Sequence, residues 1–122
     1  MRELEAAERD GQLDDGSFAP LRRLNTLSGV ASVFSCTGHP EAPHNAGYIQ
    51  LRVSRRVADI LDGGVIAKLW EDGLVCAVSK DWQFAYDTAR QQIPRISYIV
   101  RFPCGFMDRV CESICQYVNK EL

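Results

Sequence analysis

The chain has 122 residues, 46% of them hydrophobic and 25% charged, which is ordinary for one globular domain spanning residues 1–122. The formal net charge of −2 provides no overall attraction to nucleic acid or to an anionic membrane, although it is compatible with a local basic patch. No apolar run approaches the roughly 18–20 residues of a membrane span. We therefore expect no membrane partner and, because no export signal is evident, a cytoplasmic location. The odd number of cysteines, five, argues against a complete disulfide framework.

The first half of the chain alternates between helical and extended patterns. Leucines three residues apart, from Leu21 to Leu27, predict a short amphipathic helix. Apolar and polar side chains alternate after Gly47, which is typical of a strand with one buried face. Ser54 has a hydroxyl that can cap a helix, and Gly63-Gly64 is typical of a helix end. In chain order we expect a flexible polar segment at 1–16, a helix at 17–27, strands at 30–36 and 48–53, and a helix at 54–62.

The second half predicts three further strands and a helix. Asp72-Gly73 is a strong signal for a tight hairpin, so we expect strands at 65–71 and 74–79. Residues 81–92 fit no single period, and both a helix and a long loop remain open for them. Alternation over 95–102 predicts a fifth strand, and helical spacing of apolar residues over 107–118 predicts the last helix. The order predicts an α+β fold, a two-layer sandwich in which helices cover one face of a mostly antiparallel sheet of about five strands.

Both histidines of the chain lie in a short loop after a cysteine, in the stretch from Cys36 to His44. Thiolate and imidazole groups bind zinc, so Cys36, His39 and His44 are candidate ligands of a zinc ion with an open fourth position. A distant residue such as Cys76 or Cys104 is an alternative fourth ligand. In a second interpretation Cys36 is a catalytic nucleophile, with His39 or His44 as its base. The third interpretation is structural, with a buried cysteine at a strand end followed by a proline-stiffened loop.

The same stretch resembles two groups of proteins. A motif in small bacterial and phage proteins to which no activity is assigned resembles the stretch Leu24-Asn25-x-Leu27-x-Gly29-Val30-x-Ser32-Val33-x-Ser35-Cys36-x-Gly38-His39-Pro40. Ser35-Cys36-Thr37-Gly38 is also similar to the Ser-Cys-Ser-Gly segment of the wybutosine-synthesising methyltransferase family. That similarity implies S-adenosylmethionine as the cofactor and tRNA as the substrate. This chain departs from the family in its shorter length and in the His39-Pro40 continuation.

A second candidate site is the outer face of the predicted sheet. Basic and aromatic side chains alternate there, and an open sheet of this kind often holds single-stranded RNA by stacking and phosphate contacts. A polar outer face is also typical of any one-sided sheet, and a homodimer would use the same aromatic residues. The residues predicted for RNA binding are Tyr48, Arg52, Lys68, Trp70 and Arg101.

These patterns favour a binding or interaction module whose partner is a protein or a small ligand. The first alternative is a metal-dependent or Cys-dependent enzyme that uses the Cys36, His39 and His44 loop, with zinc as the expected metal. The second alternative is an RNA-binding protein. The ligand, the strand order and the oligomeric state remain open at this point.

Overall fold

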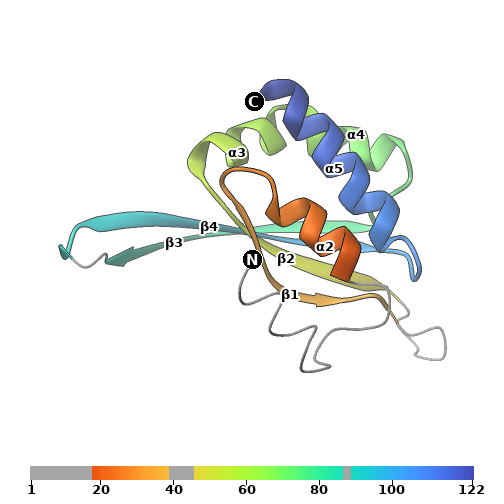
Figure 1. The fold of residues 1–122 in the computed structure, drawn as a ribbon, viewed down its shortest axis with the longest axis horizontal. Helices are drawn as coiled ribbons and strands as arrows, with labels where there is room; N and C mark the ends of the chain where they lie inside the picture. The colour runs from red at the N-terminus through yellow and green to blue at the C-terminus, as the bar shows by residue number, and fades with distance from the viewer. Residues whose placement is uncertain (1–17, 39–45, 87–88) are drawn as a thin grey trace.

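The computed structural model describes residues 18–38, 46–86 and 89–122. Within these residues the chain has an α+β fold, in which helices cover one face of a four-stranded antiparallel sheet (Figure 1). This confirms the predicted fold class, with four strands instead of about five. In chain order the elements are α2 (Phe18–Asn25), β1 (Val30–Cys36), β2 (Gly47–Val53), α3 (Arg55–Ile60), η1 (Leu61–Val65), α4 (Ile66–Glu71), β3 (Ala77–Tyr86), β4 (Gln92–Phe102) and α5 (Met107–Glu121).

The sheet has the strand order β1-β2-β4-β3, and each neighbouring pair is antiparallel. Alternate residues of β2 and β4 face the helices, so that Ile49 lies opposite Val100 and Leu51 lies opposite Tyr98, all of them buried. The register of β1 shifts between Ser32 and Phe34, which is a β-bulge. The predicted alternation of the strands is therefore confirmed, and one face of the sheet forms half of the core.

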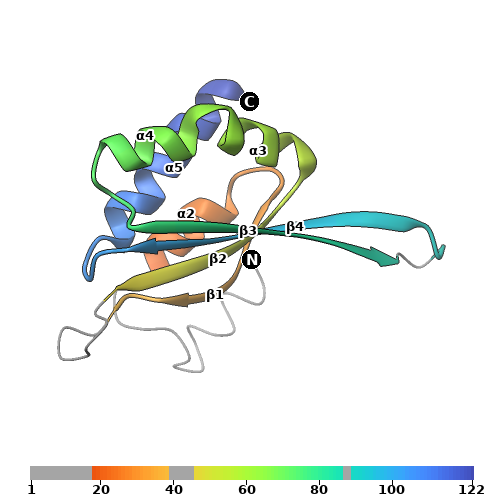
Figure 2. The same cartoon turned by 180° about the vertical axis from the view of Figure 1, so that it is seen from behind.

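Helices α2 and α5 and the α3–η1–α4 run form the second layer, on one side of the sheet (Figures 1 and 2). Ser54 caps α3 as predicted, since its hydroxyl accepts a hydrogen bond from the Val57 N–H at 3.2 Å. Ser17, the first residue of the helix predicted at 17–27, lies outside the described residues. The apolar face of α5 is buried as its spacing predicts. None of the described helices is long and apolar enough to cross a membrane.

The hairpin predicted at Asp72-Gly73 is wrong. Residues 65–71 are helical, and Asp72-Gly73 forms the turn that ends α4, with the Asp72 N–H donating to the Lys68 carbonyl at 3.0 Å. Gly73 has a φ of 70°, a conformation that ends a helix as readily as it turns a hairpin. The expected strands at 65–71 and 74–79 are replaced by α4 and a single strand that begins at Ala77.

The helix end predicted at Gly63-Gly64 is confirmed, because Gly64 has non-helical φ and ψ angles and forms a kink between two helical segments, which the π-helical turn η1 joins. Gly64 takes a φ of 150° inside this turn, a conformation that L side chains rarely adopt. The turn directs Asp62 at the sheet, where the Tyr98 hydroxyl donates to Asp62 Oδ1 at 2.6 Å and the Lys80 ammonium donates to Oδ2. These two contacts tie the helical run to β3 and β4.

The described part of residues 81–92 is neither a helix nor a long loop, the two structures that the sequence allows. β3 continues to Tyr86 and β4 begins at Gln92, and the two strands pair over this whole length. β2 pairs with β4 only from Ile96 onward. The outer parts of β3 and β4 therefore form a two-stranded arm, which projects beyond the body of the protein (Figures 1 and 2).

Candidate functional site

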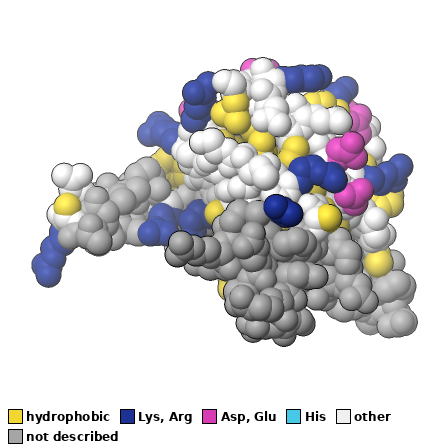
Figure 3. Space-filling view, in the orientation of Figure 1, with side chains coloured by type: hydrophobic (Ala, Val, Ile, Leu, Met, Phe, Trp, Pro, Cys, Tyr) yellow, Lys and Arg dark blue, Asp and Glu magenta, His cyan; other side chains and the backbone are white. Residues whose placement is uncertain are grey.

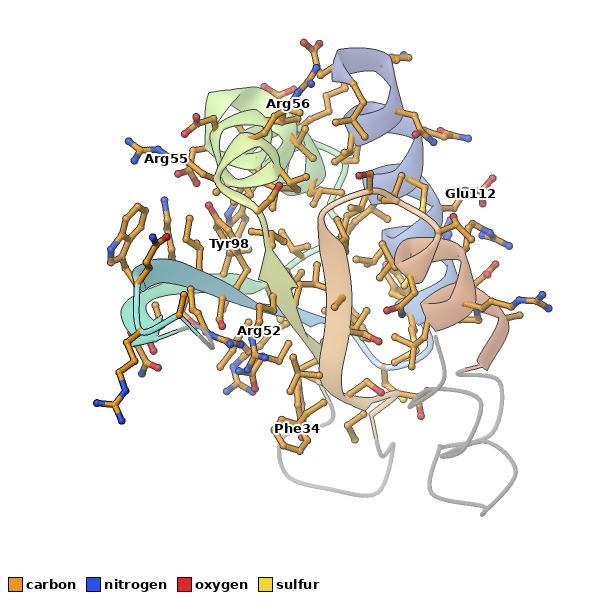
Figure 4. The ribbon with its side chains drawn as sticks, turned by 60° about the vertical axis from the view of Figure 1, so that its left-hand side comes forward. Phe34, Arg52, Arg55, Arg56, Tyr98 and Glu112 are labelled. Atoms are coloured by element: carbon orange, nitrogen blue, oxygen red, sulfur yellow. The ribbon has the colours of Figure 1, made fainter. Side chains whose placement is uncertain are left out.

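The candidate site with the best-described residues is the face of the sheet that points away from the helices. We call it the open face, because no described helix or strand covers it. Figure 4 shows Arg52 and Phe34 on this side of the sheet, whereas Tyr98 points toward the helices. The described side chains on the open face include Phe34, Tyr48, Gln50, Arg52, Asp81, Arg95, Ser97, Ile99 and Arg101.

Three of the residues predicted for RNA binding share the open face. Tyr48 of β2 lies directly opposite Arg101 of β4, and Arg52 lies opposite Ser97. The Arg101 guanidinium carbon is 5.7 Å from the centroid of the Tyr48 ring, which is a cation–π contact. Strand alternation was enough to place these side chains together.

The other two residues predicted for RNA binding are not on the sheet. Lys68 and Trp70 lie on α4 in the helical layer, because residues 65–71 form a helix and not a strand. Lys68 makes an ion pair with Glu71 at 3.9 Å, and the Trp70 side chain is exposed to solvent. The prediction that they share a face with Tyr48 is therefore wrong.

Phe34 is a residue of the open face that the sequence analysis missed. It lies opposite Gln50 and is 64% exposed, the most exposed of the large hydrophobic side chains that the structure describes. The bulge after Ser32 explains the omission: Ser32 faces the helices opposite Leu51, and the extra residue, Val33, turns Phe34 to the other side. An uninterrupted period of two would place Ser32 and Phe34 on the same face.

The open face is basic although the whole chain is acidic. Its described charged residues are three arginines, Arg52, Arg95 and Arg101, and one carboxylate, Asp81, all of them exposed. The structure pairs none of the three arginines with a carboxylate among the residues that it describes. Basic side chains at the base and at the far end of the arm are visible in Figure 3. The open face therefore presents an excess of positive charge to solvent.

Polar groups that can donate and accept hydrogen bonds lie between these charges. A shallow hollow of about 120 Å³ lies over the middle of the sheet, lined in part by Gln50, Ser97 and Asp81. The half-buried side chain of Ile99 adds an apolar surface to it. The open face thus combines cations, aromatic rings and neutral hydrogen-bonding groups.

The structure places only one member of the predicted zinc site. Cys36 is the last residue of β1, whereas His39 and His44 lie outside the described residues, so the site stays a prediction. The Gly105 N–H donates to the Thr37 carbonyl at 3.4 Å, which brings the segment of Cys104 beside that of Cys36. Among the described residues alone, no group of three or more His, Cys, Asp or Glu side chains could hold a metal ion.

Cys76 and the cysteines of α5 are poorer candidates for such a site. Cys76 lies where β3 begins, and β2 and β4 separate it from β1. Cys111 and Cys115 are buried in the core, and burial raises the pKa of each thiol above its usual value. Of the two distant ligands considered from the sequence, the fold favours Cys104.

Comparison of the chain with protein-family models, with curated proteins and with solved structures finds no match in any of the three. The open face is the candidate site whose residues the structure places most completely. Its described charged residues have an excess of positive charge, whereas the whole chain has a formal net charge of −2.

Proposed function

We propose that this chain is a binding module that holds single-stranded nucleic acid across the open face of the sheet. The observation that carries the proposal is the group of exposed arginines, Arg52, Arg95 and Arg101, which have no carboxylate partner among the described residues and lie beside the rings of Tyr48 and Phe34. Cations neutralise phosphates, and aromatic rings stack on bases that are not paired in a duplex. Both kinds of group are exposed on one surface here.

The register of the strands supports an extended ligand. Arg95 and Arg101 lie on the same strand, six residues apart, and Arg52 lies opposite Ser97 between them. At about 3.3 Å per residue, the three arginines span roughly 20 Å along the strand direction. The rings of Tyr48 and Phe34 lie toward β1, on one side of this row. A backbone following the arginines would therefore have its bases directed at the aromatic side chains.

This arrangement predicts binding that tolerates many sequences and depends strongly on salt. Every base has a face that can stack, and the contacts of arginines with phosphates carry no sequence information. Three phosphate contacts correspond to a slope of about −2 in a plot of log affinity against log salt concentration for a single strand.

Fluorescence anisotropy with a labelled oligothymidylate of about 12 nucleotides tests the proposal, because sites of this kind cover about 4–16 nucleotides. Arg52→Ala and Arg101→Ala should each weaken binding at low salt and reduce the slope by about 0.7. Arg22→Ala is the matched control, because Arg22 is an exposed arginine on α2, in the helical layer. It should leave both the affinity and the slope unchanged.

Phe34→Ala separates stacking from charge. Loss of one stacked base costs about 1–3 kcal/mol, so the affinity should fall about tenfold while the salt slope stays the same. No saturable binding at low salt, or an equal loss in Arg22→Ala, would refute the proposal. If the open face joins two copies of the chain instead, Phe34→Ala will lower the sedimentation coefficient and no oligonucleotide will bind.

A second candidate function is zinc binding at the end of β1, favoured by the hydrogen bond between Gly105 and Thr37. We infer that Cys104 joins the predicted ligands Cys36, His39 and His44, since a thiolate is a good fourth ligand for zinc. Elemental analysis of protein purified without a histidine tag should find one zinc per chain, lost in Cys104→Ser and kept in Cys76→Ser. A metal-free wild-type protein that gains no thermal stability from added zinc would exclude this site.

A further inference from the structure

An open groove lies between the α3–η1–α4 run and the C-terminal half of α5. Its volume is about 840 Å³, which is within the range of about 300–1,000 Å³ that small-molecule sites occupy. Figure 1 shows these helices at the top of the molecule, on the far side of the helical layer from the sheet. The groove is therefore separate from the open face.

Four basic side chains from three helices line the groove. They are Arg55 and Arg56 of α3, Lys68 of α4 and Lys120 of α5, whereas the carboxylates that line it are two, Asp59 and Glu121. The lining thus has an excess of two positive charges. Basic side chains along the top of the helical layer are visible in Figure 3.

Three of these cations have contacts among the described residues. Arg55 lies 5.8 Å from the centroid of the Trp82 ring, Lys120 lies 5.8 Å from that of Tyr117, and Arg56 donates to a main-chain oxygen of Leu122 at 3.3 Å. The two ring contacts leave the positive charges of Arg55 and Lys120 in place. In Figure 4, Arg56 points toward the end of α5, whereas Arg55 lies on the side of α3 away from α5.

The floor of the groove contains a glycine that the fold does not require. Gly64 needs its φ of 150°, but Gly63 has no such conformation, and a Cβ atom added to Gly63 would meet nothing within 4 Å. Glycine within a helical run is less favourable than alanine, so neither sterics nor helix propensity explains Gly63. Without a side chain there, the backbone of η1 is open to a ligand. Ile60, Val65 and the ring of Tyr117 provide the apolar part of the lining.

We propose that this groove binds a small organic phosphate monoester whose body is a planar ring. A phosphate monoester carries a charge of about −1.5 to −2 at neutral pH, which matches the excess of two positive charges. A guanidinium group binds phosphate oxygens in a bidentate manner, and Arg56, which reaches the end of α5, supplies one beside the ammonium of Lys120. The ring stacks on Tyr117 and against Ile60, above the bare backbone at Gly63. This site goes beyond the nucleic-acid interface, because it uses none of the residues of the open face.

Isothermal titration calorimetry with phenyl phosphate and with adenosine monophosphate tests the site, with phenol and adenosine as the matched uncharged probes. Both phosphates should bind saturably, and the uncharged probes should not. Arg56→Ala and Lys120→Ala should each weaken binding about tenfold or more, because each removes a charge-assisted contact. Arg109→Ala removes a cation of α5 that does not line the groove, and it should bind like the wild-type protein.

Gly63→Ala separates loss of the site from loss of the fold. Its methyl group occupies the floor of the groove, so phosphate binding should weaken, while the melting temperature stays equal or rises because alanine is the better helix former. Arg52→Ala on the open face should leave the affinity for adenosine monophosphate unchanged, so the groove and the nucleic-acid interface can fail independently. Absence of saturable binding of both phosphates, equal binding of adenosine, or an equal loss in Arg109→Ala would overturn the proposal.

Discussion

Replacing Tyr98 with phenylalanine tests the contact that ties the π-helical turn to the sheet. The substitution keeps the buried ring and removes the hydroxyl that donates to Asp62 at 2.6 Å. A hydrogen bond to a charged acceptor contributes about 1.5–3 kcal/mol to the free energy of unfolding. We expect the lower end, about 1.5 kcal/mol, because the Asp62 side chain is 45% exposed and keeps Lys80 as a partner.

Urea unfolding followed by circular dichroism measures this difference. The midpoint should fall while the dependence on urea concentration stays the same, and the melting temperature should fall by roughly 3–7 °C. Tyr117→Phe is the matched control, because the Tyr117 hydroxyl donates to Asp72 at 2.8 Å on the protein surface, where water can replace it. Equal midpoints for the two variants would refute the role assigned to the buried hydrogen bond.

The same contact predicts how stability changes at both ends of the pH range. Burial raises the pKa of the Asp62 carboxyl, but hydrogen bonds from Lys80 and Tyr98 outweigh it and lower that pKa overall. This contribution is present at neutral pH and is lost as pH falls through the lowered pKa. Burial and the neighbouring Asp62 raise the pKa of Tyr98, so its contribution is present below about pH 10 and is lost above it. Tyr98→Phe should therefore flatten the alkaline decline of stability.

Two further predictions concern backbone strain and thiol reactivity. Gly64→Ala should lower the free energy of unfolding by about 1–3 kcal/mol, because alanine adopts a φ near 150° only with strain, whereas Gly63→Ala should not lower the melting temperature. Burial and the neighbouring Cys115 raise the pKa of the Cys111 thiol, so iodoacetamide should modify exposed Cys76 in the native protein long before Cys111. Equal modification rates by mass spectrometry would contradict the packing of α5.

The parts of the fold that were predicted correctly bury one side and expose the other. β2, the later part of β4 and α5 each pack on a single layer, so their apolar residues recur with the period of the element. The α3–η1–α4 run also has such a period, because Val57, Leu61, Val65 and Leu69 are all buried. This spacing of four indicates that the chain is helical on both sides of the kink at Gly64, and the Asp72-Gly73 signal obscured the second helix, α4.

The outer part of β3 could not be predicted from a period, because its described side chains are not buried on either face. The described side chains from Lys80 to Gln83 are all exposed, so nothing selects an apolar residue at every second position. Turn and cap patterns are also local, so they do not predict which strands pair when those strands are far apart in the sequence. The strand order followed only from the structure for this reason.

Some residues of the candidate sites could be predicted from the sequence, and others could not. Tyr48, Arg52 and Arg101 were found because strand alternation alone places them on one face, and Phe34 was missed because a bulge reverses the alternation in β1. The groove could not be predicted from the sequence, since its basic residues come from α3, α4 and α5. Arg56 and Lys120 are far apart in the sequence, and only the tertiary fold brings them to the same groove.

The two-stranded arm formed by the outer parts of β3 and β4 has a consequence for local unfolding of the chain. Among the described strands, only β3 and β4 contribute to it, and a two-stranded ribbon by itself is marginally stable in water. The described side chains of the arm in β3, from Asp81 to Gln83, are exposed, so the amide hydrogens of the arm should exchange without global unfolding. The arm can therefore open while the body of the protein stays folded.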